Sequence, residues 1–112
     1  MTKSSVICRL KSKTAINSLF KEGKFFVSKN LIFRFLNSSS AENKLFCGVS
    51  VRKTTFKKAV ERNKIKRQLR VAFQKVNFFL PNSGFCMLIF KGPSVLETKK
   101  VVDEFKTLLK NF

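Results

Sequence analysis

The sequence contains no histidine, tryptophan or tyrosine, and only six of its 112 residues are acidic. Without histidine, the protein has no imidazole to serve as a general base or a metal ligand. The acids are scattered, and none forms a close pair inside an apolar run: Glu22, Glu42, Glu61, Glu97, Asp103 and Glu104. A free-standing nuclease that holds metal ions with clustered carboxylates is therefore disfavoured. We expect no catalytic residue and no metal site in the protein alone.

Cysteines and long apolar runs are also scarce. Cys8, Cys47 and Cys86 are odd in number and lack CxxC spacing, so we expect reduced, mostly buried thiols in a cytosolic protein. No segment approaches 18 uninterrupted apolar residues, and lysine and arginine interrupt the first 25 positions, so we expect neither a membrane span nor a signal peptide. A membrane-active basic protein would need an exposed apolar helix face, whereas a sheet is expected to cover each apolar stripe here.

Positive charge dominates what is present. Lys and Arg number 24, which gives a net charge of +18. The whole surface is then a positive field, which points to nucleic acid or an anionic membrane surface as the partner, and the lack of a long apolar segment favours nucleic acid. Because 44% of the residues are hydrophobic, the chain is not a disordered basic tail. Its length fits one domain with a real core, which we assign to residues 1–112.

Residues 54–76 are expected to form one amphipathic helix around which the chain is organised. Apolar side chains recur at the spacing of a buried stripe: Ile65, Leu69, Ala72, Phe73 and Val76. A neighbouring arc of the same helix carries a polar and basic band: Arg62, Asn63, Lys66, Arg67 and Arg70. A basic band on a helix is commonly just a solvated face.

The charges of this helix favour a functional reading of the band. Residues 57–75 carry eight Lys/Arg against the single Glu61, so several i,i+4 pairs repel one another. Lys57 and Lys58 are expected in the first turn, where the helix macrodipole disfavours positive charge. Folding gains nothing from this arrangement, so an external polyanion is the natural partner.

The residues before this helix predict one helix and two or three strands. Residues 1–11 are basic and irregular, and we expect residues 1–8 to be flexible. A helix follows over about 13–22, with Ser12 as its N-cap and Gly23 at its C′ position.

Strand formers dominate the next segment. Residues 25–36 form either one long strand or a short strand, a turn at 28–30 and a second strand. The polar loop 37–43 then joins what looks like a hairpin, whose other strand is 44–51.

The residues after the basic helix predict one strand and one helix. Residues 85–90 are apolar at every position, as expected of a central strand covered on both faces. Ser94 and Glu97 have the spacing of a capping box that opens the last helix, whose stripe is Val101, Val102, Phe105, Leu108, Leu109 and Phe112. The order α-β-β-(β)-α-β-α predicts a small α+β domain with a mixed sheet, in which the basic helix lies on a strand–helix–strand crossover.

Phenylalanine supplies all of the aromatic side chains, with 14 residues. Most must fill the core of a domain this small. A few exposed rings on a basic face would instead be stacking platforms for unpaired bases. The candidates are interleaved with basic residues: Phe20, Phe25, Phe26, Phe33 and Phe35. The sequence does not say which sheet face is open.

Residues 59–70 (AVERNKIKRQLR) resemble the signature of the bacterial ribonuclease P protein subunit, RN-basic-IKR-x-x-R after a strand that ends in V-x-K. The likeness extends over nearly the whole chain, including Arg9-Leu10, Leu19-Phe20, the strand 46–51 and Lys91-Gly92-Pro93. A motif in register with strand, loop and helix is far more specific than an isolated RN-x-x-KR.

This resemblance implies an α/β sandwich with a left-handed crossover, against the usual right-handed preference. It implies a cytoplasmic protein that binds the catalytic RNA of ribonuclease P and the 5′ leader of precursor tRNA, while the RNA cleaves the leader. It implies no small-molecule substrate and no cofactor bound by the protein itself, with magnesium acting through the RNA. The residues implied to bind the catalytic RNA are Lys53, Lys57, Lys58, Arg62, Asn63, Lys64, Lys66, Arg67 and Arg70. Those implied to bind the leader are Phe20, Arg34 and Lys91.

The sequence departs from the family pattern in two places. Arg34 stands where the family has a tyrosine in the leader cleft, so charge replaces stacking, with guanidinium stacking as an alternative. Lys53 is followed by Thr54 where many members have a second lysine, and the loop 52–58 lacks their Gly-Asn. The remaining alternative is a general RNA-binding structural protein such as a small ribosomal protein, which would share the composition and the fold class.

Overall fold

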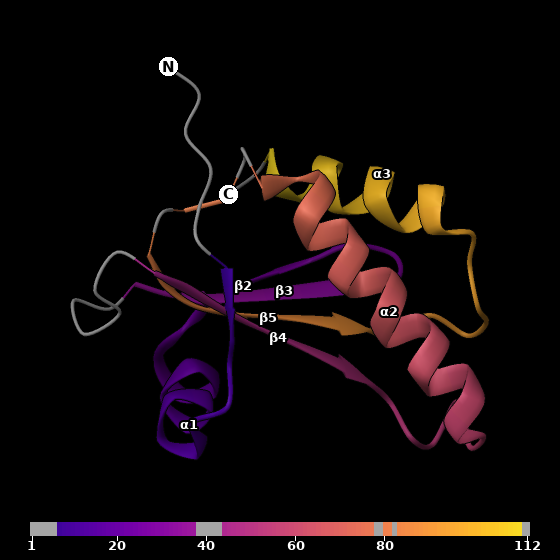
Figure 1. Ribbon diagram of the computed structural model, residues 1–112, viewed down its shortest axis with the longest axis horizontal. Coiled ribbons are helices and arrows are strands. Elements are labelled where there is room, and N and C mark those ends of the chain that lie inside the picture. Colours follow the sequence, from indigo (N-terminus) through magenta and orange to yellow (C-terminus); the bar gives the residue numbers. More distant parts are fainter. Residues whose placement is uncertain (1–6, 38–43, 78–79, 82, 111–112) are drawn as a thin grey trace.

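The computed structural model describes residues 7–37, 44–77, 80–81 and 83–110. Its elements in chain order are β1 (Ile7–Arg9), α1 (Lys13–Glu22), β2 (Lys24–Val27), β3 (Leu31–Leu36), β4 (Leu45–Val51), α2 (Ala59–Lys75), β5 (Gly84–Phe90) and α3 (Thr98–Leu109). The strands form one mixed sheet in the order β1-β4-β5-β3-β2. Helices α2 and α3 pack on one face of this sheet, and α1 lies on the other (Figure 1). The predicted α+β fold with a mixed sheet is confirmed.

The first helix forms as its sequence predicts. The backbone N–H of Ala15 donates to the Ser12 side chain over 3.2 Å, and Ala15 and Leu19 are buried. Gly23 caps the C-terminal end in an extended conformation, with φ −68°. A Cβ at this position would lie 2.4 Å from the Leu19 carbonyl oxygen. Glycine is therefore needed for close approach here, and not for a left-handed turn.

The segment 25–36 adopts the second predicted alternative, two strands joined at 28–30. Strands β2 and β3 pair antiparallel, with Phe25 opposite Arg34 and Val27 opposite Ile32. The predicted hairpin between 25–36 and 44–51 is wrong, because β5 lies between β3 and β4. The fully apolar β5 takes the central position, where both of its faces are covered. Residues 38–43 of the predicted loop lie outside the described residues.

A short edge strand was not predicted. Residues Ile7–Arg9 pair in parallel with Leu45–Cys47 of β4, so the expectation of an irregular segment over 1–11 is wrong for residues 7–9. Three residues are too few to show alternation, and pairing with a distant strand decides their conformation. Residues 1–6 of the segment expected to be flexible lie outside the described residues.

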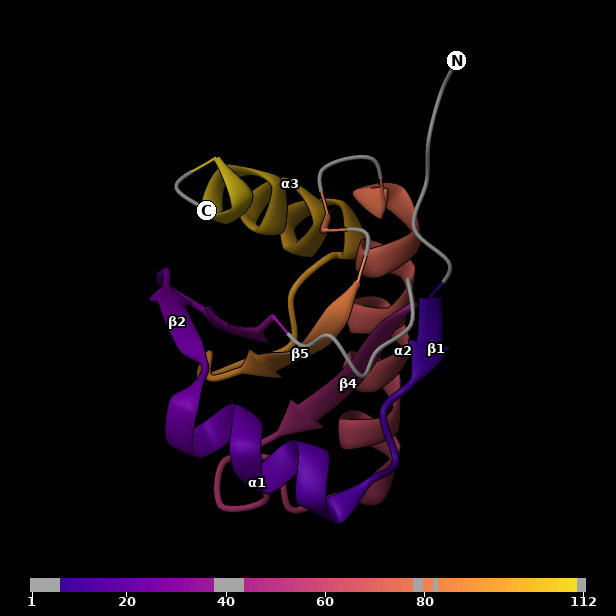
Figure 2. The same cartoon turned by 90° about the vertical axis from the view of Figure 1, so that its left-hand side faces the viewer.

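Helix α2 lies on the predicted crossover, between the adjacent parallel strands β4 and β5. The left hand of that crossover stays a prediction of the resemblance. All five residues of the predicted apolar stripe are buried: Ile65, Leu69, Ala72, Phe73 and Val76. Phe105 of α3 joins this core, with its ring centroid 5.3 Å from those of Phe33 and Phe73. The open view of Figure 2 shows α2 and α3 on the side of the sheet away from α1.

The last helix begins later than its sequence suggests. Helix α3 starts at Thr98, and its N-cap, Glu97, makes no side-chain capping bond. The predicted capping box at Ser94 is therefore wrong. The Leu96 carbonyl instead accepts a hydrogen bond from Gln68 Nε2 of α2 over 2.7 Å. Residues 94–97 lie outside the helix. The stripe residues Val101, Phe105, Leu108 and Leu109 are buried, Val102 is half-buried, and Phe112 lies outside the described residues.

Two of the three cysteines are buried, as predicted, and Cys8 is half-exposed. Cys47 and Cys86 face each other across β4 and β5, with their sulfur atoms 3.0 Å apart. Burial and the hydrogen bond with Cys47 raise the pKa of the Cys86 thiol well above its ordinary value.

One acid ties α3 to the turn between β2 and β3. The Glu104 carboxylate accepts hydrogen bonds from the Asn30 backbone N–H (2.7 Å), from Asn30 Nδ2 (2.9 Å) and from the Ser28 hydroxyl. Burial alone would raise the pKa of this carboxyl, but these hydrogen bonds lower it below its ordinary value. The ionised form of Glu104 therefore stabilises the fold.

We predict that Glu104→Gln lowers the free energy of unfolding at pH 7 by about 1–2 kcal/mol, because hydrogen bonds to a charged acceptor are stronger than those to a neutral one and this carboxylate is partly exposed. The depressed pKa makes this contribution complete above the unfolded value of about 4.3. It is lost as the pH falls through the lower pKa of the folded state. Thermal unfolding between pH 7 and pH 2.5 measures the difference. The matched control is Asp103→Asn, an exposed acid on the same helix, and equal effects of the two changes would contradict the prediction.

Candidate nucleic-acid interface

The basic helix starts later than predicted. Helix α2 begins at Ala59, with Lys58 as its N-cap, so Lys57 and Lys58 precede the first turn, and the expectation of helix over 54–58 is wrong. Buried Phe56 anchors this loop, with its ring centroid 5.9 Å from that of Phe90. Lys53, Lys57 and Lys58 are exposed around the start of the helix. The N-cap Lys58 makes no side-chain capping bond, so the first N–H groups of α2 are available to a phosphate.

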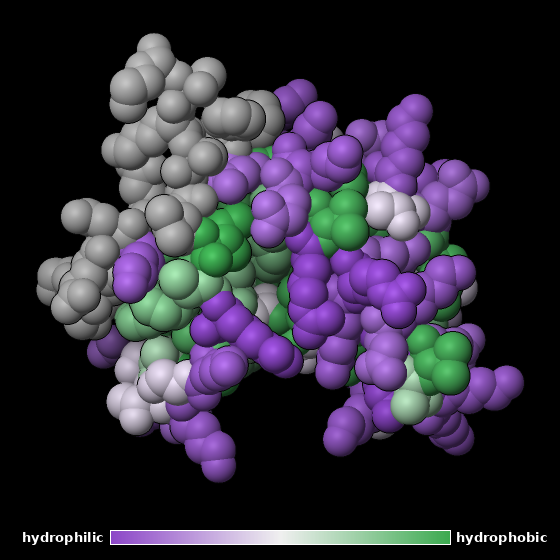
Figure 3. All heavy atoms as spheres, in the orientation of Figure 1, coloured by the Kyte–Doolittle hydropathy of each residue, from purple (hydrophilic) through white to green (hydrophobic). Residues whose placement is uncertain are grey.

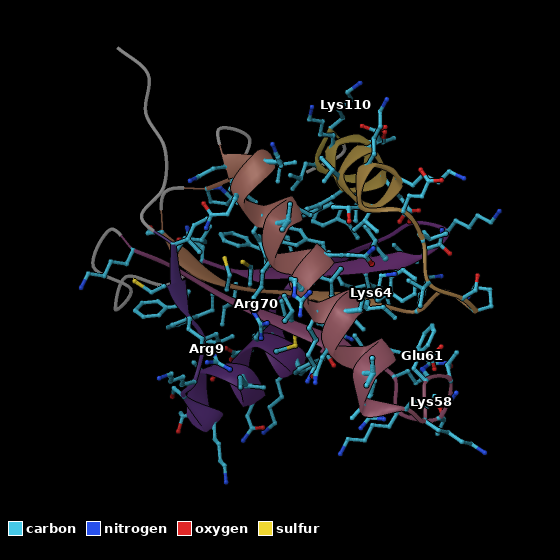
Figure 4. The ribbon with its side chains drawn as sticks, turned by 45° about the vertical axis from the view of Figure 1, so that its right-hand side comes forward. Arg9, Lys58, Glu61, Lys64, Arg70 and Lys110 are labelled. Atoms are coloured by element: carbon cyan, nitrogen blue, oxygen red, sulfur yellow. The ribbon has the colours of Figure 1, made fainter. Side chains whose placement is uncertain are left out.

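The outward side of α2 carries most of the predicted RNA-binding residues. Asn63, Lys64, Arg67 and Arg70 are exposed, and Lys66 is half-buried. Figure 3 shows the hydrophilic band that runs over this helix. In Figure 4, Lys58 lies at the start of this helix, and Lys64 and Arg70 lie further along it. The structure thus brings five of the nine residues predicted to bind the catalytic RNA together on the outward side of α2.

Arg62 differs from its neighbours on the band. It is half-buried, and its Nη1 donates to the carbonyl oxygens of Phe56 (2.7 Å) and Lys57 (2.8 Å). Arg62 therefore holds the loop before α2 in place and positions Lys57 and Lys58. Sequence reasoning assigned Arg62 to RNA binding and missed this role, because the carbonyl groups that it contacts belong to a loop of unpredictable path.

A second unpredicted residue, Gln68, fixes α2 to the start of α3. It is buried, and its Nε2 donates to Leu96 O and, over 3.3 Å, to Thr98 Oγ1. The sequence feature that could have indicated this contact is a single amide side chain beside the apolar stripe residues Ile65 and Leu69.

The second surface lies on the opposite face of the sheet, beside α1. The sheet register places Arg34 next to Phe25, and alternation sends both side chains to the face that α1 occupies. The Arg34 guanidinium carbon lies 4.5 Å from the centroid of the Phe20 ring and 5.2 Å from that of Phe25. Phe20 is 43% exposed and Phe25 59% exposed. A cation is therefore held between two rings that remain open to solvent.

The structure sorts the five candidate stacking residues. Phe20 and Phe25 are exposed, as predicted, whereas Phe33 is fully buried against α3. Phe26 and Phe35 are half-buried and pack against the same core as Phe33. Sheet alternation separates Phe25 from Phe26, Phe33 and Phe35, whereas Phe20 comes from α1. The face that carries Leu31, Phe33 and Phe35 is covered, which settles the question that the sequence left open.

Lys91 lies beyond the end of β5, four residues after Met87, which pairs with Arg34. It follows β5, is half-buried, and its backbone N–H donates to the Asn30 carbonyl over 2.8 Å. Alternation along β5 continues the face of Ile89, which is also the face of Arg34. This register assigns Lys91 to the face of Arg34, and its contact with the leader stays a prediction of the resemblance.

Other kinds of site find little support in the described residues. No three acidic or cysteine side chains there gather closely enough to hold a metal ion. None of the helices in the described ranges is both long and apolar enough to cross a bilayer.

A small α+β protein that presents a rigid basic helix on one side and aromatic rings around a cation on the other is built to bind RNA. A family model described as Ribonuclease P matches residues 6–112. The chain therefore belongs to the ribonuclease P protein family, as the resemblance of its signature helix predicted.

Known relatives support both the family and the fold. The ribonuclease P protein component of Synechocystis sp. is 33% identical over 87 residues, which covers 76% of this chain and 67% of that protein. The RNase P protein of Staphylococcus aureus superposes with a TM-score of 0.80 at 22% identity, over 92% of this chain and 93% of that one. The protein from Thermotoga maritima does so with a TM-score of 0.79 at 23% identity, over 93% and 96%.

We predict that Arg62→Ala lowers the free energy of unfolding by about 1–3 kcal/mol, because two carbonyl groups lose a charged donor. Arg67→Ala, which removes an exposed arginine one and a half turns further along, is expected to change it by less than about 0.5 kcal/mol. Urea unfolding of the two variants measures both values. If Arg62→Ala is as stable as Arg67→Ala, the loop contacts do not support the fold.

Proposed function

We propose that the protein is the RNA-binding subunit of a ribonuclease P holoenzyme, in which the RNA subunit cleaves precursor tRNA to leave the mature 5′ end. Membership of the family makes it part of an endoribonuclease. The absence of histidine supports assigning the chemistry to the RNA.

The observation that carries this proposal is the α2 surface. Six cations and one acid lie on α2, which is fixed by its buried stripe, and Lys57 and Lys58 directly precede it. A rigid row of cations neutralises phosphates without first having to be ordered. We assign binding of the catalytic RNA to this surface. Arg62 also positions the loop before α2, because its Nη1 donates to the carbonyl oxygens of Phe56 and Lys57.

The Arg34 site supports a second role, binding of the single-stranded 5′ leader. Exposed rings stack on unpaired bases whatever their sequence, and a guanidinium beside them can hold a backbone phosphate. A general RNA-binding protein, such as a ribosomal protein, would need no such site for a single strand. We propose Phe20, Arg34 and Lys91 as leader contacts, and we add Phe25, which sequence reasoning did not place there.

We further propose that the protein binds no cofactor and no small-molecule substrate, and that it acts in the cytoplasm, where precursor tRNA is processed. Magnesium would be held by the RNA subunit. The protein's part would be to place cations and rings around the two RNA molecules.

We predict that precursor tRNA is cut efficiently at low magnesium only when the protein and the matching catalytic RNA are mixed. Neither alone suffices, because the RNA lacks the positive field and the protein lacks catalytic groups. Arg67→Ala/Arg70→Ala is expected to weaken binding of the catalytic RNA by about tenfold or more and to lower the slope of log K against log salt by about two. Cleavage assays and salt titrations measure these effects.

The control for this prediction is Lys99→Ala/Lys106→Ala, which removes the same charge from exposed positions of α3. It should leave affinity nearly unchanged at moderate salt. RNA binding without stimulation of cleavage would reject the ribonuclease P role and leave a general RNA-binding protein. Cleavage by the protein alone would revive the free-standing nuclease.

We predict that Phe20→Ala and Arg34→Ala each weaken holoenzyme binding of precursor tRNA by about five- to a hundredfold, in line with about 1–3 kcal/mol per stacked base. Binding of mature tRNA, which has no leader, should not change. Competition assays with the two tRNA forms measure the difference. The control is Lys24→Ala, an exposed cation on the opposite face of β2 from Phe25. Equal losses with both tRNA forms would mean that the site does not contact the leader.

A further inference from the structure

A groove of about 520 Å³ runs along the edge of the sheet between β1 and α2. Its floor includes Val49 of β4, Phe73 of α2 and Met87 of β5, and its rim carries Arg9, Lys66 and Arg70. Figure 4 shows Arg9 and Arg70 next to each other, one from β1 and one from α2. Figure 3 shows hydrophobic surface beside β1, next to the hydrophilic band over α2.

The groove exists because β1 is shorter than its neighbour. The pairing of β1 with β4 ends with a hydrogen bond from the Leu10 N–H to the Cys47 carbonyl (2.9 Å). Beyond this point, β4 pairs only with β5 among the described strands. Backbone groups alternate sides along a strand, so the N–H and C=O of Val49 point the same way as the Cys47 carbonyl, into the groove.

The chemistry of the lining selects a particular kind of ligand. Three cations stand at the rim, and none of the lining residues is acidic, so the ligand must carry negative charge. The floor is apolar, so the ligand must also present an apolar face. The edge of β4 offers a backbone donor and acceptor side by side, which match the hydrogen-bonding edge of a nucleobase. A nucleotide combines all three properties, and the volume of the groove suits one small ligand.

We propose that this groove binds one unpaired nucleotide of the catalytic RNA, with its base on the apolar floor against β4 and its phosphates held by Arg9 and Arg70. This inference rests on the proposed RNA-binding function. The catalytic RNA is favoured over the leader because Lys66 and Arg70 belong to the basic band of α2. The Arg34 site, by contrast, lies on β3, with β5 between it and β4. The groove would let the α2 surface bind a base, whereas the rest of that surface suits phosphates alone.

A cysteine in the groove allows a test in which the unmodified protein is alkylated. Cys8 lines the groove and is half-exposed, whereas Cys86 is fully buried and Cys47 is 8% exposed. N-ethylmaleimide should therefore react first at Cys8, and Cys8→Ser identifies that product by mass spectrometry. We expect saturating catalytic RNA to slow alkylation of Cys8 at least tenfold, and precursor tRNA alone to have little effect. Unchanged alkylation in the bound complex would overturn the proposal, as would equal protection by precursor tRNA alone.

Filling the groove gives a second test. Cys8→Phe adds a ring and no charge, so it should weaken binding of the catalytic RNA about tenfold while the salt dependence keeps its slope. Arg9→Ala should weaken binding and reduce that slope by about one. Cys8→Ser is the matched control, and the thermal unfolding of each variant shows whether it is folded.

The outcomes separate this inference from the proposed function. If the unmodified protein does not bind catalytic RNA, the proposed function fails. If it binds, and folded Cys8→Phe binds equally well, only the groove proposal is overturned. If Cys8→Phe does not fold, alkylation of Cys8 in the unmodified protein still tests the groove proposal.

Discussion

The packing of α2 on the sheet is the interaction on which the rest of the structure depends. This helix carries cations whose i,i+4 pairs each cost about 0.2–0.5 kcal/mol. Burial of each large side chain of the stripe contributes about 1.5–3 kcal/mol, and Ile65, Leu69 and Phe73 are all buried. The apolar face therefore outweighs the repulsion, and a helix that would be marginal alone presents its charges rigidly. The buried amide of Gln68 and the Arg62 contacts then set where the helix lies against its two flanking loops.

The sheet separates two different surfaces by placing them on opposite faces. The basic band of α2 lies on one side, and the cation between Phe20 and Phe25 lies on the other. A protein with net charge +18 attracts RNA everywhere, so charge alone does not direct one RNA to one face. On the proposed function, shape and aromatic exposure would do so. One of the few acids, Glu104, has a structural role through the three hydrogen bonds that it accepts.

Arg34 stands where the resemblance implies a tyrosine, and its guanidinium lies against the Phe20 and Phe25 rings. A guanidinium stacked on exposed rings gains about 0.5–1 kcal/mol per contact, and its Nε is buried with no hydrogen-bond partner among the described residues. The two rings thus hold the guanidinium where a tyrosine is expected from the resemblance. On the proposed function, the surface would bind a single strand through both charge and stacking, and would depend less on the identity of one base.

The sequence by itself determined those features that depend on local periodicity and composition. The stripe of α2, the central position of the apolar β5, the cap at Ser12 and the partner class all follow from the order of residues. Only the tertiary structure decided which strands are neighbours, that residues 7–9 form an edge strand, and that α3 starts at Thr98. It also decided the contacts of Arg62 and the groove beside β4. These features depend on contacts between segments far apart in the chain, such as Gln68 with Leu96 or Cys47 with Leu10, and periodicity within one segment carries no information about them.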